Sequence, residues 1–141
     1  MIGRSKNVAK MLVVIAVMSG CATTPIPSSQ ADNVSAERHL RFRSAASGTV
    51  PIVITRDAGL MSSACSTRVF VNGELAANIR AGEKVTLNIP AGDVILGAQP
   101  DGICAGGLVE IEARLQAAKP SQYRIGYDHN GSLGLYRTAI R

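Results

Sequence analysis

Three cysteines are the residues of this chain with the clearest capacity for chemistry. Cys21 follows two small residues, Ser19 and Gly20, at the end of an apolar run. A thiol in that position can accept a lipid group, and a peptidase can cut before it because its subsites require small side chains. Once Cys21 is modified in this way, Cys65 and Cys104 remain as a pair.

The segment before Cys21 has the order of a secretion signal. Its first ten residues include three basic side chains: Arg4, Lys6 and Lys10. Residues 11–18 are apolar, but this run is far shorter than the roughly 20 residues that a membrane-spanning helix needs. The box Met18-Ser19-Gly20-Cys21 resembles the lipobox of bacterial lipoproteins. The resemblance implies removal of residues 1–20 and acylation of Cys21; a secretory signal with a chance cysteine is the alternative.

The residue after the cysteine bears on where the lipoprotein would be sorted. In enterobacteria, an Asp there retains a lipoprotein in the inner membrane, whereas this chain has Ala22. Two or more acyl chains anchor a protein firmly. We therefore expect a protein held in the outer membrane through Cys21 and facing the periplasm, with the cell surface as the alternative.

Charge and length limit the function further. Removal of residues 1–20 takes away three of the 15 basic residues, which leaves 12 against 10 acidic ones. Proteins that bind nucleic acid usually have a far stronger basic balance, so we expect no nucleic-acid partner. The rest of the 141-residue chain is long enough for one domain but not for two.

The remaining pair of cysteines has two readings. An oxidising compartment favours a disulfide between Cys65 and Cys104, and two free buried thiols are the alternative. Neither cysteine belongs to a CxxC motif or has a neighbouring His, so we expect no metal site, and no motif indicates a cofactor. A bridge would close a loop worth roughly 4 kcal/mol on a chain-entropy basis.

Two further sets of residues have the types that catalysis uses. His129 and Asp128 could join a serine in a triad, but the chain has no GxSxG motif to position it. Glu110 and Glu112 alternate along one face of an expected strand, and paired carboxylates can hydrolyse glycosides. A solvent-facing ladder of charges with Arg124 or Arg114 explains them more simply. We therefore expect no enzyme.

The pattern of the chain predicts an all-β fold. Residues 21–46 are rich in polar residues and Pro, which indicates a flexible tether, and residues 47–141 form the predicted domain. Short alternating runs and turn residues predict an antiparallel β-sandwich of seven to eight strands. Asn72-Gly73 predicts a tight hairpin, and residues 94–98 are expected to pair with residues 84–89. The predicted inward-facing residues are Val71, Ile79, Val85, Leu87, Ile89, Val109, Ile111 and Ile125.

Loops at one end of this sandwich are the candidate binding region. A bridge from Cys65 to Cys104 would join two turn-rich loops, and loops on a rigid scaffold often bind partners. Four residues in or beside these loops are candidates for binding: Asp57, Leu60, Met61 and Ile103. Their apolar members could form a contact patch or could plug the end of the sandwich.

Several motifs of this region are similar to those of uncharacterised Gram-negative lipoproteins and of PEGA-type domains, which are small envelope β-sandwiches. The similar runs are Arg56-Asp57-Ala58-Gly59, Ser63-Ala64-Cys65, Val69-Phe70-Val71-Asn72-Gly73, Gly82-Glu83, Pro90-Ala91-Gly92 and Gly102-Ile103-Cys104-Ala105-Gly106-Gly107. The resemblance implies an envelope β-domain with no known catalytic residues. We expect a non-enzymatic binding or assembly module, with an envelope protein or glycan as partner. The alternatives are an inhibitor of an envelope enzyme, like the lysozyme-inhibitor lipoproteins, and a lipoprotein of a secretion apparatus.

Overall fold

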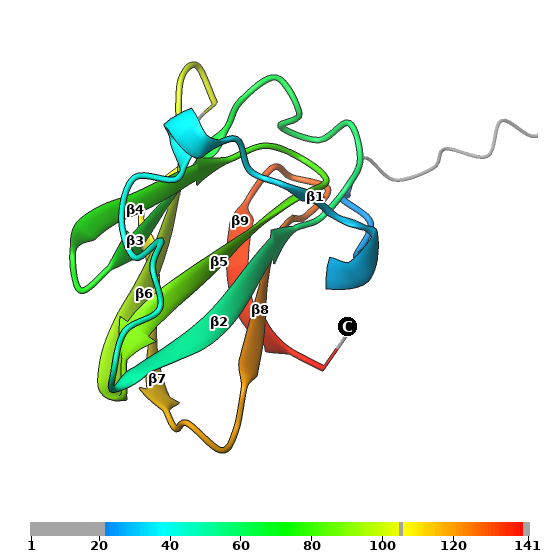
Figure 1. Ribbon diagram of the computed structural model, residues 1–141. Coiled ribbons are helices and arrows are strands. Elements are labelled where there is room, and N and C mark those ends of the chain that lie inside the picture. Colours follow the sequence, from blue (N-terminus) through cyan, green and yellow to red (C-terminus); the bar gives the residue numbers. More distant parts are fainter. Residues whose placement is uncertain (1–21, 105, 140–141) are drawn as a thin grey trace, which may run out of the picture.

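Two β-sheets packed face to face make up the protein (Figure 1). The computed structural model describes residues 22–104 and 106–139, so the predicted signal peptide and Cys21 lie outside the described residues. Within that part no helix is long and apolar enough to cross a membrane. The elements are η1 (Ser28–Gln30), β1 (Asp32–Asn33), η2 (Ala36–Arg38), β2 (Thr49–Arg56), β3 (Thr67–Val71), β4 (Glu74–Ile79), β5 (Glu83–Pro90), β6 (Gly92–Pro100), β7 (Val109–Leu115), β8 (Ser121–Tyr127) and β9 (Leu133–Thr138).

The sheet topology confirms the predicted all-β sandwich. One sheet has the order β1-β5-β2-β8-β9 and the other the order β4-β3-β6-β7. Most neighbouring strands are antiparallel, but β2 runs parallel to β8 and β1 runs parallel to β5. The parallel pair of β2 and β8 places the ends of these two strands side by side at one end of the first sheet.

Turn chemistry predicted one connection correctly and another wrongly. Asn72 and Gly73 have φ values of 49° and 79°, as a type I′ turn requires, and they connect the antiparallel strands β3 and β4. Strands β5 and β6, in contrast, do not form the predicted pair. β5 pairs with β2, and β6 pairs with β3 and β7, so the turn at Ala91 carries the chain from one sheet to the other.

The core lies between the two sheets, on the inward faces of the alternating strands. Six of the eight predicted core residues are buried: Val71, Ile79, Val85, Leu87, Ile89 and Ile125. Val109 and Ile111 are only partly buried because β7 is the last strand of its sheet. Strand β4 has a β-bulge opposite Val69 and Phe70, so that Ala77 lies opposite Val69 and Leu75 lies opposite Phe70. Both Ala76 and its neighbour Ala77 are buried.

Residues 22–46 differ from the predicted flexible tether, because they lie against the sandwich. Asp32 and Asn33 form strand β1 beside β5, and the backbone N–H groups of Leu40 and Arg41 both donate to the carbonyl of Ala76 in β4. Strands β4 and β5 would otherwise present unpaired backbone groups at sheet edges. The segment therefore pairs with backbone groups at the edges of both sheets, a role that its polar composition did not predict.

An ion pair also fastens this segment. Arg38 Nη1 and Nη2 donate to the two carboxylate oxygens of Glu83, each at 2.6 Å. Glu83 also accepts a hydrogen bond from the backbone N–H of Arg80. The hydrogen bond from Arg38 is the main reason that the pKa of Glu83 lies below its ordinary value.

This pair predicts a defined response to acid. Because the pKa of Glu83 is lowered by folding, the pair stabilises the fold above about pH 4.5, and this stabilisation is lost as the pH falls through the lowered pKa. Arg38→Met should reduce the free energy of unfolding at neutral pH by about 1–2 kcal/mol. Glu83→Gln should lose less stability on acidification than the unmodified chain, as measured by urea unfolding at several pH values. Glu112→Gln, which removes an exposed carboxylate, is the matched control; an unchanged acid dependence in Glu83→Gln would contradict the assignment.

Candidate functional site

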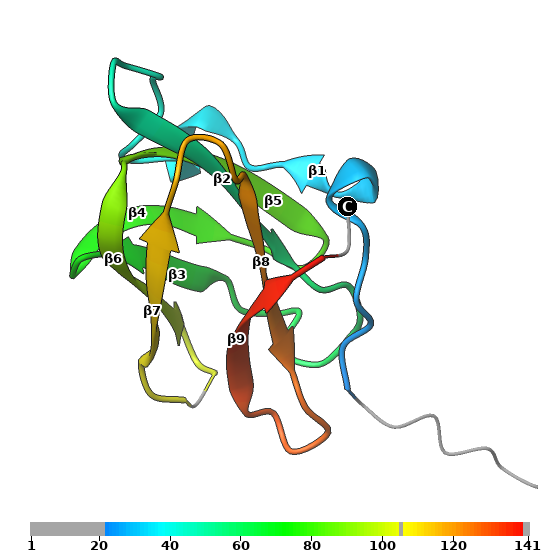
Figure 2. The ribbon, with the colours of Figure 1, turned by 90° about the horizontal axis from the view of Figure 1, so that it is seen from below.

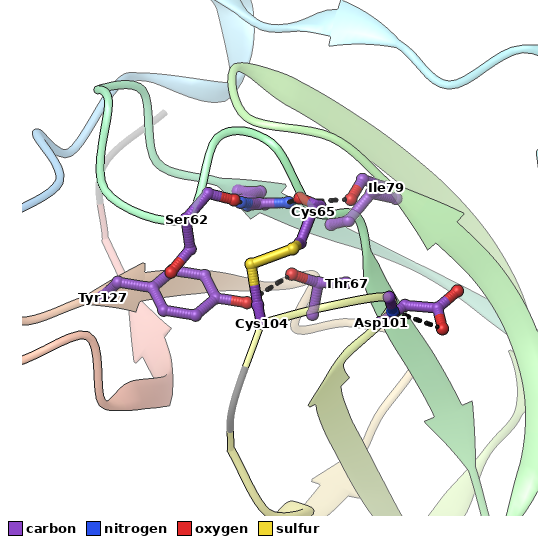
Figure 3. The surroundings of a disulfide bond; sticks show 9 residues. Ser62, Cys65, Thr67, Ile79, Asp101, Cys104 and Tyr127 are labelled. Atoms are coloured by element: carbon purple, nitrogen blue, oxygen red, sulfur yellow. Dashed lines mark hydrogen bonds between the residues drawn. A yellow bond between two sulfur atoms is a disulfide. The ribbon is translucent and has the colours of Figure 1, made fainter.

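A disulfide joins the two loops that the sequence singled out. Cys65 and Cys104 are bonded, with their Cα atoms 6.0 Å apart, which confirms the predicted pair (Figure 3). The bridge links the β2–β3 coil (residues 57–66) to the β6–β7 loop (residues 101–104 and 106–108). Cys65 lies two residues before β3 and Cys104 four residues after β6, and β3 and β6 are neighbours in the four-stranded sheet. The disulfide therefore fastens the coil and the loop to each other at one end of that sheet.

A buried arginine holds the coil beneath this bridge. Arg56, the last residue of β2, has no exposed surface. Its Nη1 donates to the carbonyls of Cys65 at 2.6 Å and Ile79 at 3.2 Å, and its Nη2 donates to the carbonyl of Ser62 at 2.7 Å. Its Cζ also lies 5.1 Å from the ring centroid of Tyr127. Burial lowers the pKa of Arg56, although Tyr127 and Glu83 act in the opposite direction.

The tyrosine that faces this guanidinium is itself fixed. The hydroxyl groups of Tyr127 and Thr67 share a hydrogen bond of 2.8 Å between the two sheets, near the disulfide (Figure 3). From the sequence, Arg56 is recognisable only as part of a motif, and the roles of Tyr127 and Thr67 were not predicted. A basic residue at the end of a β-branched run was the available signal, because a cation there must find acceptors once the run is buried.

Asp57 is buried and does not belong to a binding surface. Only 1% of its surface is exposed, its Oδ1 lies 3.5 Å from Arg124 Nε, and Thr23 Oγ1 lies 3.4 Å from its Oδ2. Burial raises the pKa of Asp57 above its ordinary value, and Arg124 and Thr23 act against that rise. The carboxylate thus faces the N-terminal segment.

That segment is joined to the same end of the sandwich by backbone hydrogen bonds. The N–H of Thr23 donates to the carbonyl of Tyr127 at 3.0 Å, and the N–H of Tyr127 donates to Thr23 Oγ1 at 2.8 Å. Thr24 and Ala58 exchange two backbone hydrogen bonds, of 2.7 and 3.0 Å. The first described residues therefore lie against the ends of β2 and β8, beside the β2–β3 coil (Figure 2).

Two facing glycines leave room for the polar side chains that cover this part of the sheet. Gly126 in β8 lies opposite Gly134 in β9. A Cβ atom at Gly126 would lie 2.6 Å from Asp57 Oδ2, and one at Gly134 would overlap the ring and hydroxyl of Tyr136. Arg124 lies between the two groups, with its Cζ 5.3 Å from the ring centroid of Tyr136 and its Nε facing Asp57.

The structure separates the apolar candidate residues into two kinds. Leu60 and Ile103 are 91% and 94% exposed, so neither plugs the end of the sandwich. Met61 is partly buried and packs against the core, as a plug would. The exposed pair lies on the two loops that the disulfide connects, with Leu60 five residues before Cys65 and Ile103 directly before Cys104.

The residues considered for catalysis have other roles or lie in solvent. Asp128 Oδ1 accepts hydrogen bonds from the backbone N–H groups of Asn130 and Ser132, so it shapes the β8–β9 turn, and His129 is exposed. Glu110 and Glu112 are exposed on β7, which lies in the other sheet from Arg124.

The predicted ladder of Glu110 and Glu112 with Arg124 is therefore wrong. Arg114, the other basic residue considered for it, instead pairs with Asp93 at 2.7 Å. Among residues 22–104 and 106–139, no three His, Cys, Asp or Glu side chains gather as a group that could hold a metal ion.

The disulfide should contribute much of the stability of this end. Replacing both Cys65 and Cys104 by Ser should lower the free energy of unfolding by about 2–5 kcal/mol, the usual range for a small disulfide-bonded domain. Urea unfolding of the oxidised protein, the reduced protein and the double variant measures this difference. Equal stability of the oxidised protein and the double variant would show that the bridge is dispensable for the fold.

The two facing glycines should differ in their tolerance of a side chain. Gly126→Ala should cost about 1–3 kcal/mol, because the buried carboxylate of Asp57 has little room to move. Gly134→Ala should cost less than about 1 kcal/mol, because Tyr136 is half exposed and its ring can turn into solvent. Denaturant unfolding of both variants tests this contrast, and an equal cost at the two positions would refute it.

Comparison with known proteins adds no family to this description. The chain matches no model of a known protein family, and no curated protein is significantly similar to it. The resemblance to envelope lipoproteins and PEGA-type domains therefore stays a prediction from the motifs alone.

Proposed function

We propose that this protein is a lipid-anchored envelope protein of the outer membrane, with an acylated Cys21 as its first residue. Its β-sandwich would act as a non-enzymatic binding or assembly module that faces the periplasm. The proposal rests on the box that ends in Cys21, together with the position of the residues that follow it.

The attachment of Thr23 and Thr24 to the sandwich is the observation that carries this proposal. Their hydrogen bonds to Tyr127 and Ala58 begin two residues after Cys21, and a cut between Gly20 and Cys21 would break none of them. Two residues of extended chain span at most about 7 Å. A lipid on Cys21 would therefore hold the folded domain close to the membrane, without a long linker.

The disulfide is consistent with this location. Cys65 and Cys104 form a disulfide. Disulfides form and persist in the periplasm and outside the cell, whereas cytosolic thiols are kept reduced. The bond does not distinguish one envelope compartment from another. It does support export, which the N-terminal signal predicts independently.

We call the end of the sandwich that carries the β2–β3 coil and the β6–β7 loop the loop end. The contacts that its polar side chains make favour a scaffold over an enzyme. The guanidinium of Arg56 is occupied by three carbonyl groups and a tyrosine ring, and Asp57 faces Arg124 and Thr23. Catalytic acids and bases need to reach a substrate, and these groups instead connect strands and loops. The arrangement supports a rigid module with a fixed loop end.

Replacement of the predicted lipid acceptor tests the proposal. Cys21→Ala should abolish labelling of the protein by a radioactive or clickable fatty acid and should release it from the membrane fraction. The variant should keep its fold and its disulfide, because the bridge joins Cys65 to Cys104. Cys65→Ser is the matched cysteine control and should retain the label; label on Cys21→Ala, or none on the unmodified protein, would refute the lipid anchor.

A further inference from the structure

Two side chains at the loop end are much more exposed than other large hydrophobic residues. Leu60 and Ile103 are 91% and 94% exposed, whereas the remaining exposed large hydrophobic residues among those described lie between 43% and 52%. One of the pair lies on the β2–β3 coil and the other on the β6–β7 loop. The Cys65–Cys104 bridge and the hydrogen bonds of Arg56 hold these loops in place.

The N-terminal segment reaches the same end of the sandwich. Gly59, which precedes Leu60, approaches the N-terminal segment so closely that a Cβ atom there would lie 3.3 Å from the Cα of Thr23. Figures 1 and 2 both show the segment meeting the sandwich beside the β2–β3 coil, at the end that also carries the β6–β7 loop. If Cys21 is acylated, the bilayer surface would therefore lie at this end of the sandwich.

We propose that Leu60 and Ile103 insert into the lipid surface and hold the loop end of the sandwich against the membrane. This inference rests on the proposed anchor at Cys21. The lipid would supply the attachment, and the two side chains would fix the orientation of the domain. The turn at Asn72 and the ion pair between Asp93 and Arg114 lie at the opposite end of β3, β6 and β7 and would face away from the bilayer.

A lipid surface suits this pair better than a protein partner does. A stable protein interface buries about 800 Å² on each partner, whereas here two single side chains project from narrow loops. Side chains of this kind can lie at the boundary between headgroups and acyl chains, where burial of apolar area favours binding. Of the charged residues nearby, Asp57 faces Arg124 and Asp101 on the β6–β7 loop faces Arg68.

The absence of tryptophan from the sequence allows a direct test. Leu60→Trp and Ile103→Trp each place a single indole reporter at an exposed position, so the fold should tolerate them. The lipidated full-length chain would be reconstituted into vesicles of phosphatidylethanolamine and phosphatidylglycerol. Both reporters should shift their emission to shorter wavelength and be quenched by lipids that carry a nitroxide near the headgroup. Ile95→Trp, on β6 and 43% exposed, is the control and should show neither change.

Each result has a definite meaning. Unquenched, water-like emission from both reporters in protein that carries the fatty acid would overturn this inference and leave the anchor intact. Failure of the unmodified protein to acquire a lipid would instead refute the anchor. A blue shift that occurs in native envelopes but not in pure lipid vesicles would assign the two side chains to a protein partner and also overturn the inference. In the Cys21→Ala background, Leu60→Ser should weaken any residual vesicle binding about tenfold, because the apolar contact is lost.

Discussion

The guanidinium of Arg56 is the group on which the loop end depends. A buried cation is costly unless it is surrounded by acceptors, and this one has three backbone carbonyls and an aromatic ring. Those partners come from the β2–β3 coil, from the end of β4 and from β8. One side chain thus connects both sheets to the coil, and the disulfide extends this connection to the loop after β6.

The N-terminal segment completes the sandwich in a second way. Between residues 22 and 46 it runs past the ends of β2 and β8, along β5 and then across β4. It therefore covers two strands that would otherwise form sheet edges, and exposed edges invite pairing with other chains. The proposed anchor and the protection of the edges would depend on the same stretch of polypeptide.

Features that depend on local chemistry could be predicted from the sequence. Alternation along residues 84–89 gave the correct buried face, Asn72-Gly73 gave the correct turn, and the cysteine count gave the correct pair. The crossing from β5 to β6 could not be predicted, because a short turn after an alternating strand suits a hairpin and a change of sheet equally well.

Residues whose partners are distant in sequence were also beyond prediction. Asp57 has a polar side chain in a turn-rich region, yet it is buried because Thr23 and Arg124 approach it from other elements. The polar residues at positions 22–46 predicted a solvent-exposed segment, but backbone groups of this segment form hydrogen bonds with the edge strands β4 and β5. The two cysteines thus predicted which loops meet, but the burial of Asp57 depends on partners that local sequence does not show.

The attachment of Thr23 and Thr24 also determines how mechanical force would pass through the molecule. A pull on the N-terminus first loads the hydrogen bonds that join these residues to Tyr127 and Ala58. Those partners lie at the ends of β8 and β2, which occupy inner positions of the five-stranded sheet. Tension on the N-terminus would therefore enter the sandwich through its central strands, and the covered edges at β4 and β5 would be loaded only after this first contact had opened.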